Sequence, residues 1–286
     1  MDQLIELRLD LLRDMGIIIT DTNYFIKITN RYGYHEVVWQ YLDHFIKRVN
    51  KESITFKHPI TFEEIYNFYC LDQHLKNQVM ISLQLFEQSF KVALAEISFL
   101  GKNRQLAKNI NPQTKQPRQF LKEKYQLKNR HVIRRGDVKS RIRHIKQNYL
   151  EPYGGYREVA GEATYWVIFK EMSFGVATNY FFLMPIKCQK QVLARVFKSH
   201  ITLRKFEKWL ETIRYFQRRA AHNYRPLGIK VGRQFLYQKI SDRLYLLQNL
   251  EPRELLKQKI PETIDEYLGK YPYEKEFLSK NLECCD

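Results

Sequence analysis

Turn-forming residues are scarce in this chain, which has only 11 glycines and 9 prolines in 286 residues. An all-β fold needs many Gly- and Pro-containing turns between short strands, so this scarcity argues against one. Hydrophobic residues make up 44% of the chain, which is enough to bury a sizeable core. The composition therefore predicts an all-α, mainly helical protein, built as one compact body with subdomains.

Cysteine is scarce as well, with four in the whole chain and no Cys-x-x-Cys pair. Cys70 and Cys188 stand alone, and Cys284 and Cys285 are adjacent. No histidines have the spacing that zinc ligands usually show. We therefore expect free thiols, no metal site and no cofactor.

A long apolar run is also missing. The most apolar stretch, residues 174–186, is interrupted by Thr178, Asn179 and Pro185, and a membrane-spanning helix needs about 20 apolar residues. The first ten residues include acidic side chains where a secretion signal would be basic. These features predict a cytoplasmic protein that does not cross a membrane.

Acidic residues are almost absent from residues 101–150, which contain 15 Lys and Arg but only Glu123 and Asp137. Most of the chain's net charge of +17 therefore lies in one segment, which predicts binding to a polyanion, most simply RNA. Aromatic rings at Phe120, Tyr125 and Tyr149 would allow unpaired bases to stack. The candidate RNA-binding residues are Lys122, Lys124, Lys128, Arg130, Arg134, Arg135, Lys139, Arg141, Arg143 and Lys146.

Hydrophobic periodicity predicts the helices. The clearest helix has apolar residues at three- and four-residue steps from Leu75 to Ile97, after a capping box at 61–64 that marks a helix start. Two helices are expected between Tyr24 and Val49, and a basic helix over 138–149. In the tail, three prolines are expected at the starts of short helices: Pro252, Pro261 and Pro272.

The sharpest feature is the segment 204–225. At about 100° per residue, its apolar residues gather on one side of a helix, and a second face carries Arg214, Arg218, His222 and Arg225. Metal-independent RNA cleavage needs an imidazole to move protons and guanidinium groups to neutralise the phosphate. The alternative is an ordinary charged, solvated helix face.

The end of this segment, Phe216-Gln-Arg-Arg-Ala-Ala-His-Asn-Tyr-Arg225, resembles the signature of the Abi-like abortive infection family (AbiD/AbiF type), which is related to HEPN ribonucleases. Ala221, His222 and Arg225 match that signature. Further matches in chain order are Asp72 with Leu75, Phe86-Glu87 with Lys91, Trp166-Val167 and Met172-Ser-Phe-Gly175. The sequence departs from the pattern five residues before His222, where Gln217 replaces the usual arginine.

The resemblance implies a fold and its organisation along the chain. It implies a HEPN-like helical bundle with an N-terminal helical part and a basic insertion. The expected parts are N-terminal helices with the first long core helix (1–100), a basic arm or insertion (101–158), helices that complete the bundle and carry the Arg/His motif (159–249), and a helical tail (250–286).

The resemblance also implies a function. It implies an antiphage, toxin-like ribonuclease that forms a homodimer and is restrained by a structured RNA, as in a toxin–antitoxin pair, or by a partner protein. The implied catalytic residues are His222, Arg218 and Arg214, and the supporting residues are Arg225, Tyr224 and Glu87.

Several alternatives stay open. Glu87 and Lys91 have the i,i+4 spacing of an ordinary surface ion pair. The chain could instead be a non-catalytic RNA-binding module, with Gln217 marking a degenerate site. A DNA-binding helix-turn-helix regulator would suit the charge, but the sequence gives no convincing recognition helix.

Overall fold

The computed structural model describes residues 3–50, 53–106, 120–148 and 164–282, and the side chains of these residues apart from 101–106. The protein is mainly helical, as predicted. The strands in the described residues form three short antiparallel pairs. None of the described helices combines the length and the apolar character that a membrane crossing requires.

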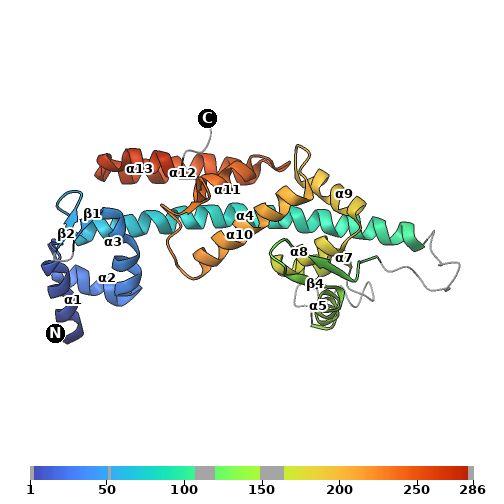
Figure 1. The fold of residues 1–286 in the computed structure, drawn as a ribbon, viewed down its shortest axis with the longest axis horizontal. Helices are drawn as coiled ribbons and strands as arrows, with labels where there is room; N and C mark the ends of the chain where they lie inside the picture. The colour runs from blue at the N-terminus through green and yellow to red at the C-terminus, as the bar shows by residue number, and fades with distance from the viewer. Residues whose placement is uncertain (1–2, 51–52, 107–119, 149–163, 283–286) are drawn as a thin grey trace. The chain divides into compact units, whose positions relative to one another are not determined.

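The described residues form two compact units, and each unit combines distant parts of the sequence. The first unit takes its residues from Met1–Ile81, Glu211–Asp242 and Arg253–Asp286. The second takes Ser82–Leu210 and Arg243–Pro252. Two helices contribute several turns to both units: α4 (Phe62–Leu106), which is continuous over 45 residues, and α10 (Leu203–Ala221) (Figure 1). The end of α11 and the start of α12, two residues each, also fall in the second unit. The predicted segments 1–100 and 159–249 therefore each contribute residues to both units.

The first unit holds the N-terminal and C-terminal helices around the beginning of α4. Its other elements are α1 (Gln3–Asp14), α2 (Thr22–Tyr32), the π-helical turn η1 (His35–Trp39), α3 (Gln40–Phe45), β1 (Ile46–Val49), β2 (Ile54–Phe56), β5 (Lys230–Val231), β6 (Gln234–Phe235), α11 (Leu236–Leu244), α12 (Glu251–Lys270), the 3-10 turn η2 (Pro272–Glu274) and α13 (Lys275–Leu282).

Local signals explain where the helices of the first unit begin. The Asp21 carboxylate accepts a hydrogen bond from the Tyr24 N–H at 3.0 Å and caps α2. Thr61 accepts one from the Glu64 N–H at 3.1 Å, as the predicted capping box requires. The predicted helix up to Val49 is wrong at its end, because residues 46–49 pair with β2 as a strand.

The C-terminal prolines give a mixed result. Pro252 and Pro272 stand in the first turns of α12 and η2, as predicted. Pro261 does not begin a helix, because α12 continues through it. Proline lacks the N–H that would bond to residue 257, so α12 loses one hydrogen bond there without ending.

The second unit is built around an aromatic core on α4. Its other elements are β3 (Lys124–Gln126), β4 (Val132–Arg134), α5 (Arg135–Asn148), α7 (Tyr165–Glu171), α8 (Phe174–Leu183) and α9 (Ile186–Val196). Phe86 and Phe90 are fully buried and pack against Phe181, Phe206 and Trp209, with ring centroids 4.6 to 5.6 Å apart for the pairs between the helices. The predicted apolar stripe of α4 is thus buried throughout, from Leu75 to Ile97.

The described part of the basic segment, residues 120–148, packs into the second unit. Its apolar side chains Leu121, Leu127, Ile133 and Val138 are buried. The Lys122 N–H donates to the Leu183 carbonyl at 2.8 Å, and the Lys128 N–H donates to the buried Glu207 carboxylate at 2.7 Å. The predicted basic helix exists as α5 and begins at Arg135, three residues earlier than expected.

Candidate functional site

The helix α10 has the two faces that its sequence predicts. Phe206, Trp209, Leu210, Ile213 and Phe216 are buried. On the outer face, Arg218 and His222 are exposed, and Arg214 is half-buried. Burial lowers the pKa of Arg214, and the nearby Glu211 carboxylate counters that shift. The steps of four residues from Arg214 to Arg218 to His222 place these side chains in one row along the helix.

The helix ends earlier than expected, at Ala221. The His222 N–H still bonds to the Arg218 carbonyl, but the next residue, Asn223, has a φ of +56° and turns the chain away. The Asn223 N–H donates to the Ala220 carbonyl at 3.1 Å, and the Tyr224 N–H donates to the Arg219 carbonyl at 2.8 Å. This pair of bonds is a Schellman motif with asparagine at its left-handed position.

Arg225 therefore does not share the helix face with Arg218 and His222. Its guanidinium group makes two hydrogen bonds to the Asp43 carboxylate, at 2.6 and 3.0 Å, and lies 5.7 Å from the centroid of the Tyr41 ring. Its carbonyl accepts two hydrogen bonds from the side chain of Arg219, at 3.1 and 2.6 Å. Arg225 thus anchors the loop that follows His222.

A buried carboxylate, Asp72 on α4, holds the same loop from inside. It accepts hydrogen bonds from the Tyr41 hydroxyl at 2.8 Å and from the Leu227 N–H at 3.1 Å, and the Lys76 ammonium lies 3.7 Å away. Burial raises the pKa of Asp72 and lowers that of Lys76, and each of the two groups counters the shift of the other. Asp72 joins α3, α4 and the loop into one rigid corner.

Two tyrosines flank the arginine row. The guanidinium carbons of Arg218 and Arg219 lie 5.8 and 5.7 Å from the centroid of the Tyr215 ring, and Arg219 lies 5.6 Å from that of Tyr224. The Tyr224 side chain is 53% exposed, and its ring centroid lies 6.3 Å from that of His222. Among the described residues, the exposed His222 ring has no hydrogen-bond partner. The outer face is therefore a cationic patch with aromatic rings, which we call the Arg/His patch: Arg214, Tyr215, Arg218, Arg219, His222 and Tyr224.

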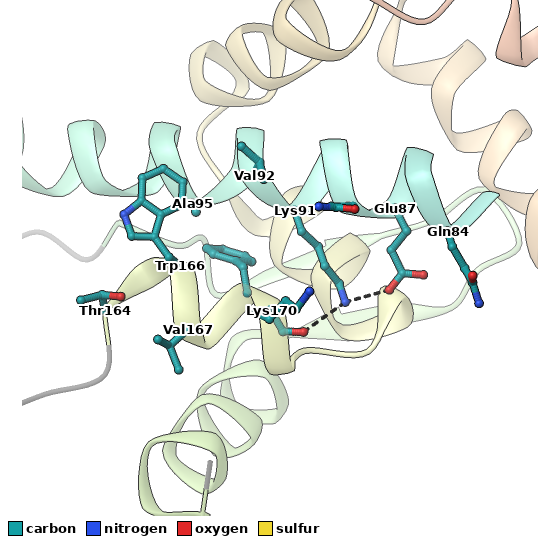
Figure 2. Close-up of a pocket in the computed structure, with 11 residues that line it drawn as sticks. Gln84, Glu87, Lys91, Val92, Ala95, Thr164, Trp166, Val167 and Lys170 are labelled. Atoms are coloured by element: carbon teal, nitrogen blue, oxygen red, sulfur yellow. Dashed lines mark hydrogen bonds and ion pairs between the residues drawn. The ribbon is translucent and has the colours of Figure 1, made fainter. Parts of the chain in front are cut away.

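Glu87 belongs to the second unit, whereas His222 belongs to the first. The Glu87 carboxylate forms an ion pair with the Lys91 ammonium at 2.7 Å, and the same ammonium lies 3.5 Å from the Lys170 carbonyl oxygen. Figure 2 shows Lys91 pointing between Glu87 and Lys170 on the wall of a cavity of about 660 Å³ between α4 and α7. Glu87 is thus engaged in the i,i+4 pair that its spacing allows, and its supporting role at the His222 site stays a prediction.

The predicted RNA-binding residues have different degrees of exposure. Those that are exposed are Lys124, Lys128, Arg130, Arg134, Lys139, Arg141 and Arg143, and Lys122, Arg135 and Lys146 are half-buried. Arg135 donates to the Leu121 carbonyl at 3.1 Å, which fixes the start of α5. The Tyr125 ring stacks on Phe182, 5.1 Å away with planes 19° apart, so this face of the ring is already covered. Tyr149 lies outside the described residues.

Sequence reasoning missed two residues that shape the corner after α10. The first is Asn223, whose left-handed backbone conformation and side-chain contacts hold the corner. The second is Arg219 in the last turn of α10, a half-buried member of the Arg/His patch whose guanidinium group binds the Arg225 carbonyl. The signal for Asn223 was present, because asparagine after a helix is the commonest substitute for glycine at the left-handed position.

Comparison with known proteins gives a family. A family model described as Abi-like protein matches residues 27–226, which is more than half of the chain and includes the whole of α10 and the corner after it. No curated protein and no solved structure matches the chain.

Proposed function

Because the chain belongs to the Abi-like protein family, whose function is abortive infection, we propose that it is an RNA-binding effector that cleaves RNA through His222 and Arg218 without a metal ion. The observation that carries this proposal is the exposure of these two side chains, one helical turn apart, beside a corner that Asn223 and Arg225 bind to the rest of the first unit. Arg214 extends the same row toward the rest of the helix.

The chemistry suits these residue types. In metal-independent RNA cleavage the 2′-hydroxyl attacks the neighbouring phosphorus, the bond from phosphorus to the 5′ oxygen breaks, and a 2′,3′-cyclic phosphate forms. A base takes the 2′ proton and an acid protonates the departing 5′ oxygen, and imidazole can serve in either role. Arg218, whose exposed guanidinium lies one turn from His222, would neutralise the charge that develops on the phosphate.

The two proton transfers also favour a pair of chains. One imidazole would take the 2′ proton and then carry it to the departing 5′ oxygen, whereas two copies of His222 could act as base and acid at the same time. HEPN ribonucleases, which the motif resembles, dimerise in this way. The exposed Arg/His patch is where a second copy would have to dock for this purpose, so we include a homodimer in the proposal.

The exposed basic residues of the hairpin β3–β4 and of α5 would hold the RNA. The described stretch 120–148 has ten Lys and Arg against two acidic residues, and its apolar side chains Leu121, Leu127, Ile133 and Val138 are buried in the second unit. Such a surface binds the phosphate backbone, and the affinity should fall steeply with salt because counterions are released on binding. A structured RNA held there is a candidate for the antitoxin that would restrain the protein.

The test uses the purified protein, stripped of copurified nucleic acid, incubated in EDTA with total bacterial RNA. Arg218→Ala and His222→Ala should each lower the cleavage rate on the order of a hundredfold or more. Arg204→Ala, an exposed arginine near the start of α10, and His200→Ala, an exposed histidine, are the matched controls and should cleave normally. Cyclic-phosphate ends are expected on the products, and His222→Ala cleaving at the rate of the unmodified protein would refute the proposal.

A non-catalytic RNA-binding module is the second candidate. It is favoured by Gln217, which replaces the arginine of the family signature and is half-buried on α10. This candidate predicts salt-sensitive RNA binding that His222→Ala leaves unchanged and no cleavage by any variant. Replacing the exposed Lys139, Arg141 and Arg143 by alanine should then weaken RNA binding. The slope of the logarithm of the affinity against the logarithm of the salt concentration should become shallower by up to about three.

A further inference from the structure

Asn223 is one of the side chains that hold the corner after α10, and it is the one next to His222. Its amide oxygen accepts hydrogen bonds from the Gln73 amide at 2.7 Å and from the Lys76 ammonium at 2.9 Å, both on α4. Its amide nitrogen donates to the Glu36 carboxylate on η1 at 3.0 Å. Three side chains from two other elements thus hold the residue next to His222.

The polarity of this cluster requires an amide. Lys76 is buried and can only donate, whereas the Glu36 carboxylate can only accept. An asparagine side chain offers an acceptor to one and a donor to the other, so its orientation is determined by its neighbours. Aspartate would place a second carboxylate against Glu36, and glycine would offer neither group.

The same residue also satisfies the backbone. A φ of +56° is unfavourable for most side chains, but asparagine tolerates it better than other non-glycine residues. The two Schellman bonds of the corner depend on this conformation. Asn223 therefore combines a reversal of the chain with an anchor to α4 and η1.

The anchor continues beyond Asn223. Glu36 also accepts a hydrogen bond from Gln40 at 2.5 Å, and Gln40 accepts one from the Arg225 N–H at 3.1 Å. The residues on both sides of the exposed Tyr224 are thus bound to the η1–α3 segment. His222, one residue before Asn223, is the last residue that the α10 ladder holds.

From this geometry we propose that Asn223 is the positioning residue of His222, acting through its contacts with Glu36, Gln73 and Lys76. The proposal rests on the proposed function, because positioning matters for catalysis only if His222 reacts. Asn223 itself touches no reacting atom in this scheme. Its effect is to keep the imidazole on the same side of α10 as Arg218.

The experiment replaces Asn223 by glycine, which keeps the left-handed backbone and removes the anchor. Misplacing a catalytic group by about 1 Å can cost on the order of a hundredfold in rate, so kcat for RNA cleavage should fall about tenfold to a hundredfold in Asn223→Gly, with KM unchanged. Asn50→Gly, an exposed asparagine that follows β1 and lies outside the proposed site, is the control and should leave kcat unchanged. Gln73→Ala removes only one contact and should give a smaller loss in the same direction, which keeps the test valid if Asn223→Gly folds poorly.

A second readout does not depend on activity. The NMR signal of the His222 ring, assigned with His222→Ala, should shift or broaden in Asn223→Gly and Gln73→Ala, whereas that of the exposed His200, in the second unit, should not. An unchanged His222 signal together with unchanged kcat overturns the positioning role. A changed signal in a protein that never cleaves RNA would support positioning while refuting the proposed nuclease, so the two failures are distinguishable.

Discussion

Replacing Asp72 by asparagine should destabilise the first unit far more than its small change in shape suggests. The side chain is completely buried, and asparagine keeps its size while removing the negative charge. One oxygen now accepts from the Leu227 N–H and the other from the Tyr41 hydroxyl. In Asp72→Asn one of these acceptors becomes a donor, and the buried Lys76 loses its counter-ion 3.7 Å away.

The size of the effect follows from these losses. Breaking a buried ion pair by removing one partner costs about 3–5 kcal/mol, because the remaining charge stays uncompensated. The Lys76 ammonium keeps its hydrogen bond to Asn223, so we expect the lower end, about 3 kcal/mol. Lys76→Met in the same protein removes the stranded charge and should recover at least about 1 kcal/mol.

Hydrogen exchange resolved by peptide is the suitable assay, because it reports on each of the two units separately. A loss of about 3 kcal/mol should speed the slowest exchanging amides of α11 on the order of a hundredfold. The control is Asp10→Asn on α1, whose exposed carboxylate lies 3.8 Å from Arg13 and should matter by less than about 0.5 kcal/mol. Exchange within about fivefold of the unmodified protein in Asp72→Asn, roughly 1 kcal/mol, would refute the assignment of Asp72 as the centre of the corner.

Three further changes test other parts of the fold. Burial lowers the pKa of His44, against the opposing effect of Glu274, so the unfolded chain takes up this proton at a higher pH than the folded protein does. The free energy of unfolding should therefore fall as the pH drops below about 6.5. His44→Gln should weaken this pH dependence, as measured by urea titrations. Arg225→Lys keeps the charge but loses the two-point contact with the exposed Asp43, and should cost about 1 kcal/mol in the same titrations. Phe86→Ala should cost about 3–5 kcal/mol in the second unit, seen as earlier unfolding by Trp fluorescence.

The helices were predictable because their signals are local. Each apolar residue of α4 from Leu75 to Ile97 that fits the helical period is buried, and the caps at Asp21 and Thr61 accept the hydrogen bonds that their positions indicate. Strand β1 was not predictable in the same way. Its residues Ile46, Arg48 and Val49 pair with β2, and that pairing, rather than their own propensity, ends the preceding helix.

In the candidate site, too, some features follow from local spacing and others from contacts between residues that are far apart in the chain. The row of Arg214, Arg218 and His222 depends only on helical spacing, and the three residues follow one another along α10 and its C-terminal cap. The contacts behind that face link residues far apart in the chain. Asp72 binds the Leu227 N–H across 155 positions, and Asn223 binds Glu36 across 187. No periodicity encodes such pairs, since they exist only once the first unit has folded.

Two arginines near His222, Arg225 and Arg218, differ in their match to the family signature and in their exposure. Arg225 matches the signature, yet its side chain is only 12% exposed and its guanidinium group is held by two hydrogen bonds to Asp43. Arg218 does not have the spacing of the signature, yet it is exposed one turn from His222. If Arg225 bound phosphate, the RNA would compete with Asp43 for its guanidinium group and weaken one of the anchors of the loop. In this chain Arg225 therefore holds the corner after α10, and Arg218 is the exposed arginine that could bind a phosphate group next to His222.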